Sequence, residues 1–97
     1  MKTYTICGSM RFAAEMQRIA YELETRRGWN VLQCAYTPDG ASPSPAEVQL
    51  LSDAHRRKID LSDGIYVVNP GGYVGESTAA EIAYARRTGK DVLFHCP

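Results

Sequence analysis

Apolar and polar residues follow two distinct patterns along the chain. Four short runs rich in β-branched and aromatic side chains predict strands, at residues 4–7, 30–34, 64–68 and 91–95. Between these runs the apolar residues recur at helical spacing. The clearest stripe consists of Phe12, Met16, Ile19, Ala20 and Leu23. The sequence therefore predicts a regular succession of strands and helices that begins and ends with a strand.

Helix-boundary residues support this succession. Ser9 precedes the first stripe as a candidate N-cap, and Gly28 follows two arginines as a helix stop. Residues 44–47 (Ser-Pro-Ala-Glu) form a capping box with proline at the first helical position, and Gly89 ends a third helix. Such alternation is typical of a parallel sheet with right-handed crossovers. We expect a single α/β domain over residues 1–97, flavodoxin-like or Rossmann-like, with three layers, four strands in the order 2-1-3-4 and three helices.

The stretch from residue 60 to residue 90 contains the most informative pattern. A strand with the composition of a buried one, residues 64–68, is followed by a glycine-rich loop, and helical spacing resumes near Thr78. In a parallel α/β sheet, ligands bind where strands end and such loops begin. The loop after the first strand ends at the same edge of the sheet. We therefore expect these two loops to form a ligand crevice.

The first loop, Gly8-Ser9-Met10-Arg11, is a candidate anion site. Backbone N–H groups at a helix start and an arginine side chain favour a phosphate group. The alternative is a tight turn with an N-cap serine and a solvated arginine. The chain contains no G-K-[ST] sequence and no G-x-G-x-x-G sequence, so this loop is neither a P-loop nor a dinucleotide fingerprint.

The second loop and the helix after it provide Gly75, Ser77 and Glu81. Glu81 is expected one turn into that helix, where its carboxylate could face the crevice. Residues 78–81 (Thr-Ala-Ala-Glu) also fit a capping box, in which Glu81 would only accept a hydrogen bond from a backbone amide. The residues alone leave both interpretations open.

Three further polar residues have simple structural interpretations. His55 lies on an apolar helix face that runs from Val48 to Ile59, which favours a half-buried histidine with satisfied hydrogen bonds. Asp60 is expected to cap the turn between that helix and the central strand. Tyr84 is expected in the core.

Composition excludes several classes of partner. Eleven basic and 11 acidic residues give a formal net charge of zero, which argues against a nucleic-acid polymer as partner. The apolar runs are far shorter than the ~20 residues of a membrane span, and the N-terminus has no signal-peptide pattern. Three widely spaced cysteines without a C-x-x-C pair favour reduced thiols. We expect a cytoplasmic protein without metal, cofactor or membrane partner.

The motifs quoted above resemble the nucleoside 2-deoxyribosyltransferase family, whose relatives include N-glycosidases of nucleoside 5′-monophosphates. The resemblance lies in residues 8–11 after the first strand and in residues 63–90. Within the second stretch, residues 81–85 (Glu-Ile-Ala-Tyr-Ala) and the turn at Gly89-Lys90 carry the family's pattern. The order of elements matches over nearly the whole chain, whereas the specific motif spans about thirty residues.

The resemblance implies cleavage or transfer at the N-glycosidic bond of a small nucleoside or nucleotide. Glu81 would be the nucleophile at C1′ of the sugar, and the covalent glycosyl-enzyme would be resolved by water or a second base. Residues 8–11 would bind a 5′-phosphate, with Ser77 and the amides near Gly75 completing the pocket. Asn69, at the end of the central strand, is a further candidate for binding substrate.

The chain departs from the family's pattern in two respects. Relatives have an aspartate in the helix before the central strand, acting near the leaving base, and here that position falls near His55, so Asp60 is the nearest substitute. Relatives also continue beyond the fourth strand. The chain is therefore a minimal member, a homodimer that completes its pocket between subunits, or a non-catalytic nucleotide-binding module with the same fold. Of the oligomeric states, we expect the homodimer.

Overall fold

The computed structural model describes all residues of the chain, 1–97. Its strands form one parallel sheet in the order β2-β1-β3-β4, which confirms the predicted topology. The strands are β1 (Thr3–Gly8), β2 (Asn30–Leu32), β3 (Gly64–Val68) and β4 (Asp91–Phe94). The central strands β1 and β3 pair from Tyr4 opposite Gly64 to Gly8 opposite Val68. Their carboxyl ends therefore finish side by side.

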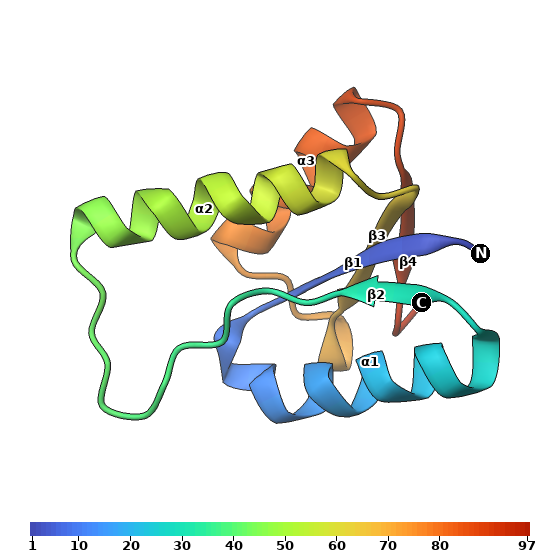
Figure 1. Cartoon of the computed structure of the whole chain (residues 1–97), viewed down its shortest axis with the longest axis horizontal. Coiled ribbons are helices and arrows are strands. Elements are labelled where there is room, and N and C mark those ends of the chain that lie inside the picture. Colours follow the sequence, from blue (N-terminus) through green and yellow to red (C-terminus); the bar gives the residue numbers. More distant parts are fainter.

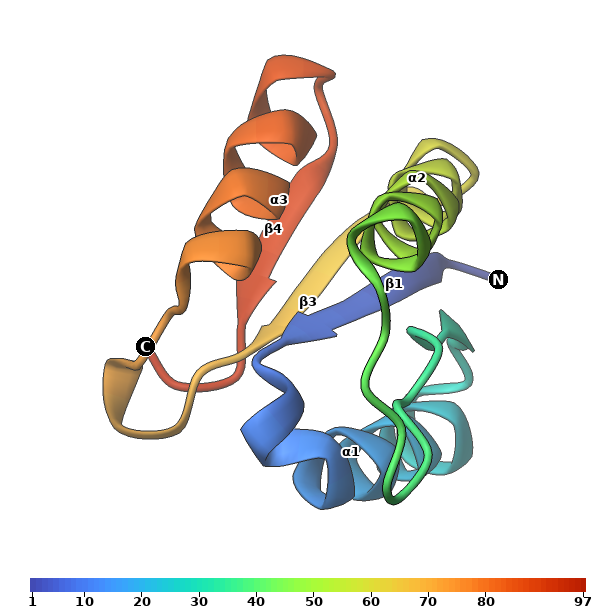
Figure 2. The ribbon, with the colours of Figure 1, turned by 90° about the vertical axis from the view of Figure 1, so that its left-hand side faces the viewer.

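Helices cover both faces of the sheet (Figure 1). The elements outside the sheet are a 3₁₀ turn η1 (Met10–Phe12), α1 (Ala13–Arg27), α2 (Pro45–Asp60), a second 3₁₀ turn η2 (Pro70–Gly72) and α3 (Glu76–Arg87). Figure 2 shows α1 on one face of the sheet and α2 and α3 on the other. No helix combines the length and the apolarity that a membrane crossing requires.

Each face of the sheet has its own apolar core. The α1 cluster contains Ile6, Met16, Ile19, Ala20, Leu23, Val31 and Val68. The α2–α3 cluster contains Cys7, Ile59, Ile65, Val67, Ile82 and Ala85. Successive residues of a strand point to opposite faces, so Ile6 and Cys7 of β1 belong to different clusters.

The predicted boundary residues Gly28 and Ser44 are correct, whereas Ser9 caps the 3₁₀ turn η1 and α1 itself begins at Ala13. Gly28 ends α1 with a positive φ of 68°, a conformation that favours glycine. Ser44 and Glu47 form both hydrogen bonds of the capping box at the start of α2. Strand β2 is shorter than the predicted residues 30–34, because its pairing with β1 ends at Leu32.

The predicted apolar face of α2 is buried over only part of its length. His55 and Ile59 are buried, whereas Val48 and Leu51 are 51% and 40% exposed. Figure 1 shows the reason, because the N-terminal half of α2 reaches past the carboxyl ends of the strands. This overhang leaves apolar side chains beside the edge of the sheet where the sequence predicts a crevice.

Candidate functional site

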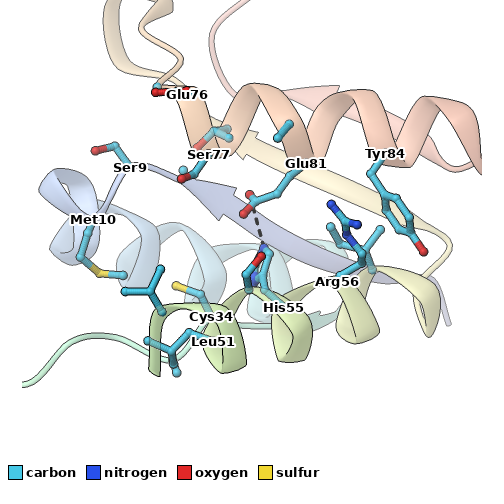
Figure 3. Close-up of a pocket in the computed structure, with 18 of the residues that line it drawn as sticks. Ser9, Met10, Cys34, Leu51, His55, Arg56, Glu76, Ser77, Glu81 and Tyr84 are labelled. Carbon is cyan, nitrogen blue, oxygen red and sulfur yellow. Dashed lines mark ion pairs between the residues drawn. The ribbon is translucent and has the colours of Figure 1, made fainter. Parts of the chain in front are cut away.

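A cavity of about 510 Å³ lies at the carboxyl ends of β1 and β3, under the overhanging half of α2. Both predicted loops line it, with Gly8, Ser9 and Met10 from the first and Gly75 and Ser77 from the second. Figure 3 shows Ser9 and Ser77 at one end of this cavity. The loops meet because β1 and β3 are neighbours that end in register.

Glu81 points into this cavity from the second turn of α3 (Figure 3). The helix begins at Glu76, with Gly75 as an N-cap that offers no side-chain hydrogen bond. Thr78 therefore lies inside the first turn, where it is buried, and of the two interpretations of residues 78–81 the capping box is wrong. The Glu81 side chain is 27% exposed, so its carboxylate is available to a ligand.

His55 lies opposite Glu81 on α2 and contacts two groups through one nitrogen. Its Nε2 is 3.5 Å from Oε1 of Glu81 and 3.3 Å from Sγ of Cys7. The residue is only 8% exposed, and its buried Nδ1 has no hydrogen-bond partner. The prediction of a satisfied histidine is therefore wrong for Nδ1. A proton on Nδ1 would be left unpaired, whereas a proton on Nε2 lies beside the Cys7 sulfur and the Glu81 carboxylate, so the tautomer protonated on Nε2 fits best.

This arrangement differs from a cysteine protease-like triad. In such a triad the thiol and the acid contact opposite nitrogens of the imidazole, so that the acid orients the base. Here Cys7 and Glu81 approach the same nitrogen. Burial raises the pKa of the Cys7 thiol well above its ordinary value, and the negative charge of Glu81 raises this pKa further. Cys7 is therefore a protonated thiol and not an activated nucleophile.

Asp60 does not reach the cavity, contrary to the role expected from the resemblance. It is the last residue of α2, at the end of the helix away from the overhang. Its Oδ1 accepts a hydrogen bond of 2.5 Å from the hydroxyl of Tyr84. Tyr84, which was expected in the core, is partly exposed and lines the far end of the cavity. Asp60 thus orients a lining residue instead of lining the cavity itself.

Asn69 and Arg11 also occupy positions that differ from their expected roles. The buried amide of Asn69 donates to the backbone oxygen of Cys96 and accepts from its backbone N–H, so it anchors the C-terminal segment. Arg11 is exposed, and its guanidinium lies 4.4 Å from the centroid of the Tyr73 ring. Of these two residues, Tyr73 lines the cavity and Arg11 does not, so Arg11 stands at the outer rim.

Arg56 is a lining residue that the sequence analysis did not identify. Its guanidinium lies 4.5 Å from the centroid of the Tyr84 ring, and both residues stand at the end of the cavity opposite Ser9 (Figure 3). The sequence signal that could have identified Arg56 was its position next to His55, on a helix that faces the crevice. An arginine within a helix is usually solvated, so this signal does not single it out.

Comparisons with known proteins provide information on the fold. No family model matches this sequence, and no curated protein matches it. A solved structure of a conserved protein from Enterococcus faecalis V583 is similar, with a TM-score of 0.66 and 19% sequence identity. The alignment covers 97% of this chain and 62% of that one, so the chain spans less than two thirds of the neighbour's length. At this identity the likeness shows the α/β fold alone.

Proposed function

We propose that this protein cleaves or transfers the N-glycosidic bond of a nucleoside or nucleoside 5′-monophosphate through Glu81. The observation that carries the proposal is the position of the Glu81 carboxylate. It faces a cavity formed by two loops at the carboxyl ends of neighbouring parallel strands, and no helix cap engages it. The resemblance to the nucleoside 2-deoxyribosyltransferase family supplies the reaction class.

In this mechanism the Glu81 carboxylate attacks C1′ and forms a glycosyl ester. The base leaves with the electrons of the broken C–N bond and takes a proton from solvent in the cavity. Water or a second base then attacks C1′ and loses its proton to solvent, and the C1′–O bond to Glu81 breaks, which releases the carboxylate. The imidazole of His55, whose Nε2 is 3.5 Å from Oε1, stands beside the carboxylate and helps to keep it oriented between turnovers.

The cavity offers polar groups for the phosphate of a nucleotide and apolar groups for its base. The first-turn amides of α3 have no side-chain cap, and the Ser9 hydroxyl lies beside them, so this end of the cavity favours a phosphate. Arg11 stands at the rim of the same end. Met10 and Leu51 provide apolar contact for a base. We therefore expect Arg11→Ala to weaken binding of monophosphates more than binding of nucleosides. An equal loss for both ligands would remove the preference for nucleotides.

The decisive assay incubates the purified chain with ribo- and deoxyribonucleosides and their 5′-monophosphates, with and without an acceptor base. Chromatography then measures released base. We expect release by the wild type and by Glu15→Gln, a matched change on the exposed side of α1. Glu81→Gln should lose at least about a thousandfold in rate, because an amide does not form the ester. Equal rates for Glu81→Gln and wild type would refute the nucleophile.

We also propose that the chain forms a homodimer. Leu50 and Leu61 of the α2 region are 68% and 66% exposed, which leaves large apolar side chains unpaired in a single copy. Sedimentation at several protein concentrations tests this state. A monomer at the highest concentration would contradict it.

A non-catalytic nucleotide-binding module is the second candidate, and the position of Asp60 favours it. With Asp60 hydrogen-bonded to Tyr84 outside the cavity, no second carboxylate is placed by the leaving base as the resemblance requires. Thermal stabilisation by a nucleotide without release of base from any substrate would support this candidate. Base release that depends on Glu81 would exclude it.

A further inference from the structure

The groups around Nε2 of His55 form a cluster that the proposed reaction does not fully use. Cys7, His55 and Glu81 come from β1, α2 and α3 and contribute a thiol, an imidazole and a carboxylate. Their ligand atoms all lie within 4.8 Å of one another. Thiolate, imidazole and carboxylate are the donors that Zn²⁺ accepts in proteins, and catalytic sites use three of them with one open position. We propose that these three residues bind a Zn²⁺-like divalent cation.

The separations of the donor atoms suit a tetrahedral ion. With bonds of about 2.3 Å to sulfur and about 2.0 Å to nitrogen and oxygen, neighbouring ligands of a tetrahedral zinc stand about 3.3–3.5 Å apart. The distance from His55 Nε2 is 3.3 Å to Sγ of Cys7 and 3.5 Å to Oε1 of Glu81. The third separation, between Cys7 Sγ and the Glu81 carboxylate, is within 4.8 Å, and the partly exposed Glu81 side chain is the ligand that can move to shorten it.

The cavity supplies access and the fourth ligand position. Cys7 is 1% exposed and His55 8% exposed, whereas Glu81 opens to the cavity. An ion would therefore enter past Glu81 and keep a water on that side. Binding requires the thiolate, so the thiol proton of Cys7 leaves as the Zn–S bond forms. The positive charge of the ion compensates the buried thiolate and the carboxylate together.

The imidazole predicts a site that exchanges its ion readily. A metal on Nε2 places the ring proton on Nδ1, and metal-bound histidines usually donate this proton to a second group. Here Nδ1 has no partner. Loss of such a partner weakens metal binding about 10–100-fold in other proteins. We therefore expect reversible binding that occupies Glu81, so that Zn²⁺ blocks the carboxylate and inhibits any base release.

Cobalt titration of the reduced, metal-free full chain tests the site directly. Co²⁺ should bind one ion per chain with a thiolate charge-transfer band in the near ultraviolet and visible bands of a four-coordinate ion, and Zn²⁺ should displace it. Cys7→Ser should abolish the charge-transfer band. His55→Gln should weaken binding at least about a hundredfold, more than loss of an outer partner does. Glu81→Gln, at the exposed corner, should weaken it about tenfold or more.

Cys34→Ser is the matched control, because Cys34 lines the same cavity but lies outside the cluster. Its spectrum should equal that of the wild type. Absence of a thiolate band in the wild type, or a band that survives Cys7→Ser and disappears in Cys34→Ser, would overturn the proposal. If Cys7→Ser does not fold, the affinities of His55→Gln and Glu81→Gln decide the outcome. No substrate is present, so this result is independent of the proposed glycosidic activity.

Discussion

The two faces of the sheet use their buried residues differently. The α1 cluster is wholly apolar, and α1 contributes Met16, Ile19, Ala20 and Leu23 to it from one face. On the other face, the α2–α3 cluster stands beside the buried His55 and Thr78. The first face is a continuous core, whereas the second is interrupted by the cavity. Stability and chemistry are therefore concentrated on opposite sides of one sheet.

The overhang of α2 is the feature that separates the two faces. Helix α1 runs along the sheet and buries a full stripe, but the first half of α2 extends beyond the strands and leaves Val48 and Leu51 exposed. The overhang encloses a cavity at the expense of packing. Substitutions on the α1 face should mainly change stability, whereas substitutions of the side chains that line the cavity should mainly change function.

The largest effect is expected for Ile19→Ala. Ile19 is 2% exposed in the α1 cluster, and its truncation leaves a cavity that costs about 2–5 kcal/mol in free energy of unfolding. Leu51→Ala is the matched change on α2, where 40% exposure limits the loss to about 1 kcal/mol. Chemical denaturation monitored by circular dichroism measures both. Equal losses would show that the overhang is packed as firmly as the core.

Gly8→Ala addresses the boundary between the two regions. Gly8 lines the cavity, yet a Cβ there would meet Sδ of Met16 at 2.9 Å and the backbone oxygen of Val68 at 3.0 Å. Such overpacking costs about 1–3 kcal/mol. The backbone at residue 8 would have to move to relieve these contacts, and the first loop, which follows it, would move too. We therefore expect nucleotide affinity to fall in the same variant. Isothermal calorimetry and denaturation on one preparation measure both changes, and a loss of affinity at unchanged stability would contradict this coupling.

Local sequence signals were sufficient to predict the fold and the place of the crevice. The capping box at Ser44 and the glycine at position 28 act within one turn of the chain, and both have the predicted geometry. The apolar run of β3 fixed the centre of the sheet because a strand buried on both faces excludes polar residues. Alternation of elements with right-handed crossovers left few possible strand orders, and the expected order 2-1-3-4 is the one observed.

The chemistry of the crevice depended on distances that the sequence does not contain. Cys7, His55 and Glu81 are brought together by three elements, and their contact depends on the pairing of the strands and the position of each helix along the sheet. The start of α3 was misplaced because Gly75 caps without a side chain, whereas Thr78 and Glu81 match a capping box by composition. Because residues 78–81 match a capping box locally, the sequence did not show that the Glu81 carboxylate faces the cavity.

A smaller effect is expected from Ser44→Ala, which tests the overhang itself. Ser44 caps the half of α2 that has little tertiary support, and loss of an N-cap costs about 1 kcal/mol. Hydrogen bonds with the backbone and then the side chain of Ser44 lower the pKa of Glu47. A lowered pKa stabilises the fold above the ordinary carboxyl range, and this stabilisation is lost as pH falls through the lowered pKa. The difference in unfolding free energy between wild type and Glu47→Gln should therefore shrink on acidification, and an increase would contradict the capping box.

The smallest change in stability is expected for His55→Leu, although the site is buried. Nδ1 of His55 has no partner, so the imidazole retains an uncompensated cost of burial that an apolar side chain of similar size avoids. Glu81 keeps access to water through the cavity after the change. We expect the free energy of unfolding to stay within about 1 kcal/mol of the wild type or to rise, while cobalt binding is lost. Ile59→Ala, one turn further along the same buried face, should cost several times more because it only removes packing. A loss of about 3 kcal/mol or more in His55→Leu would show that the imidazole stabilises this face, and that the division between a structural and a functional side of the sheet does not hold.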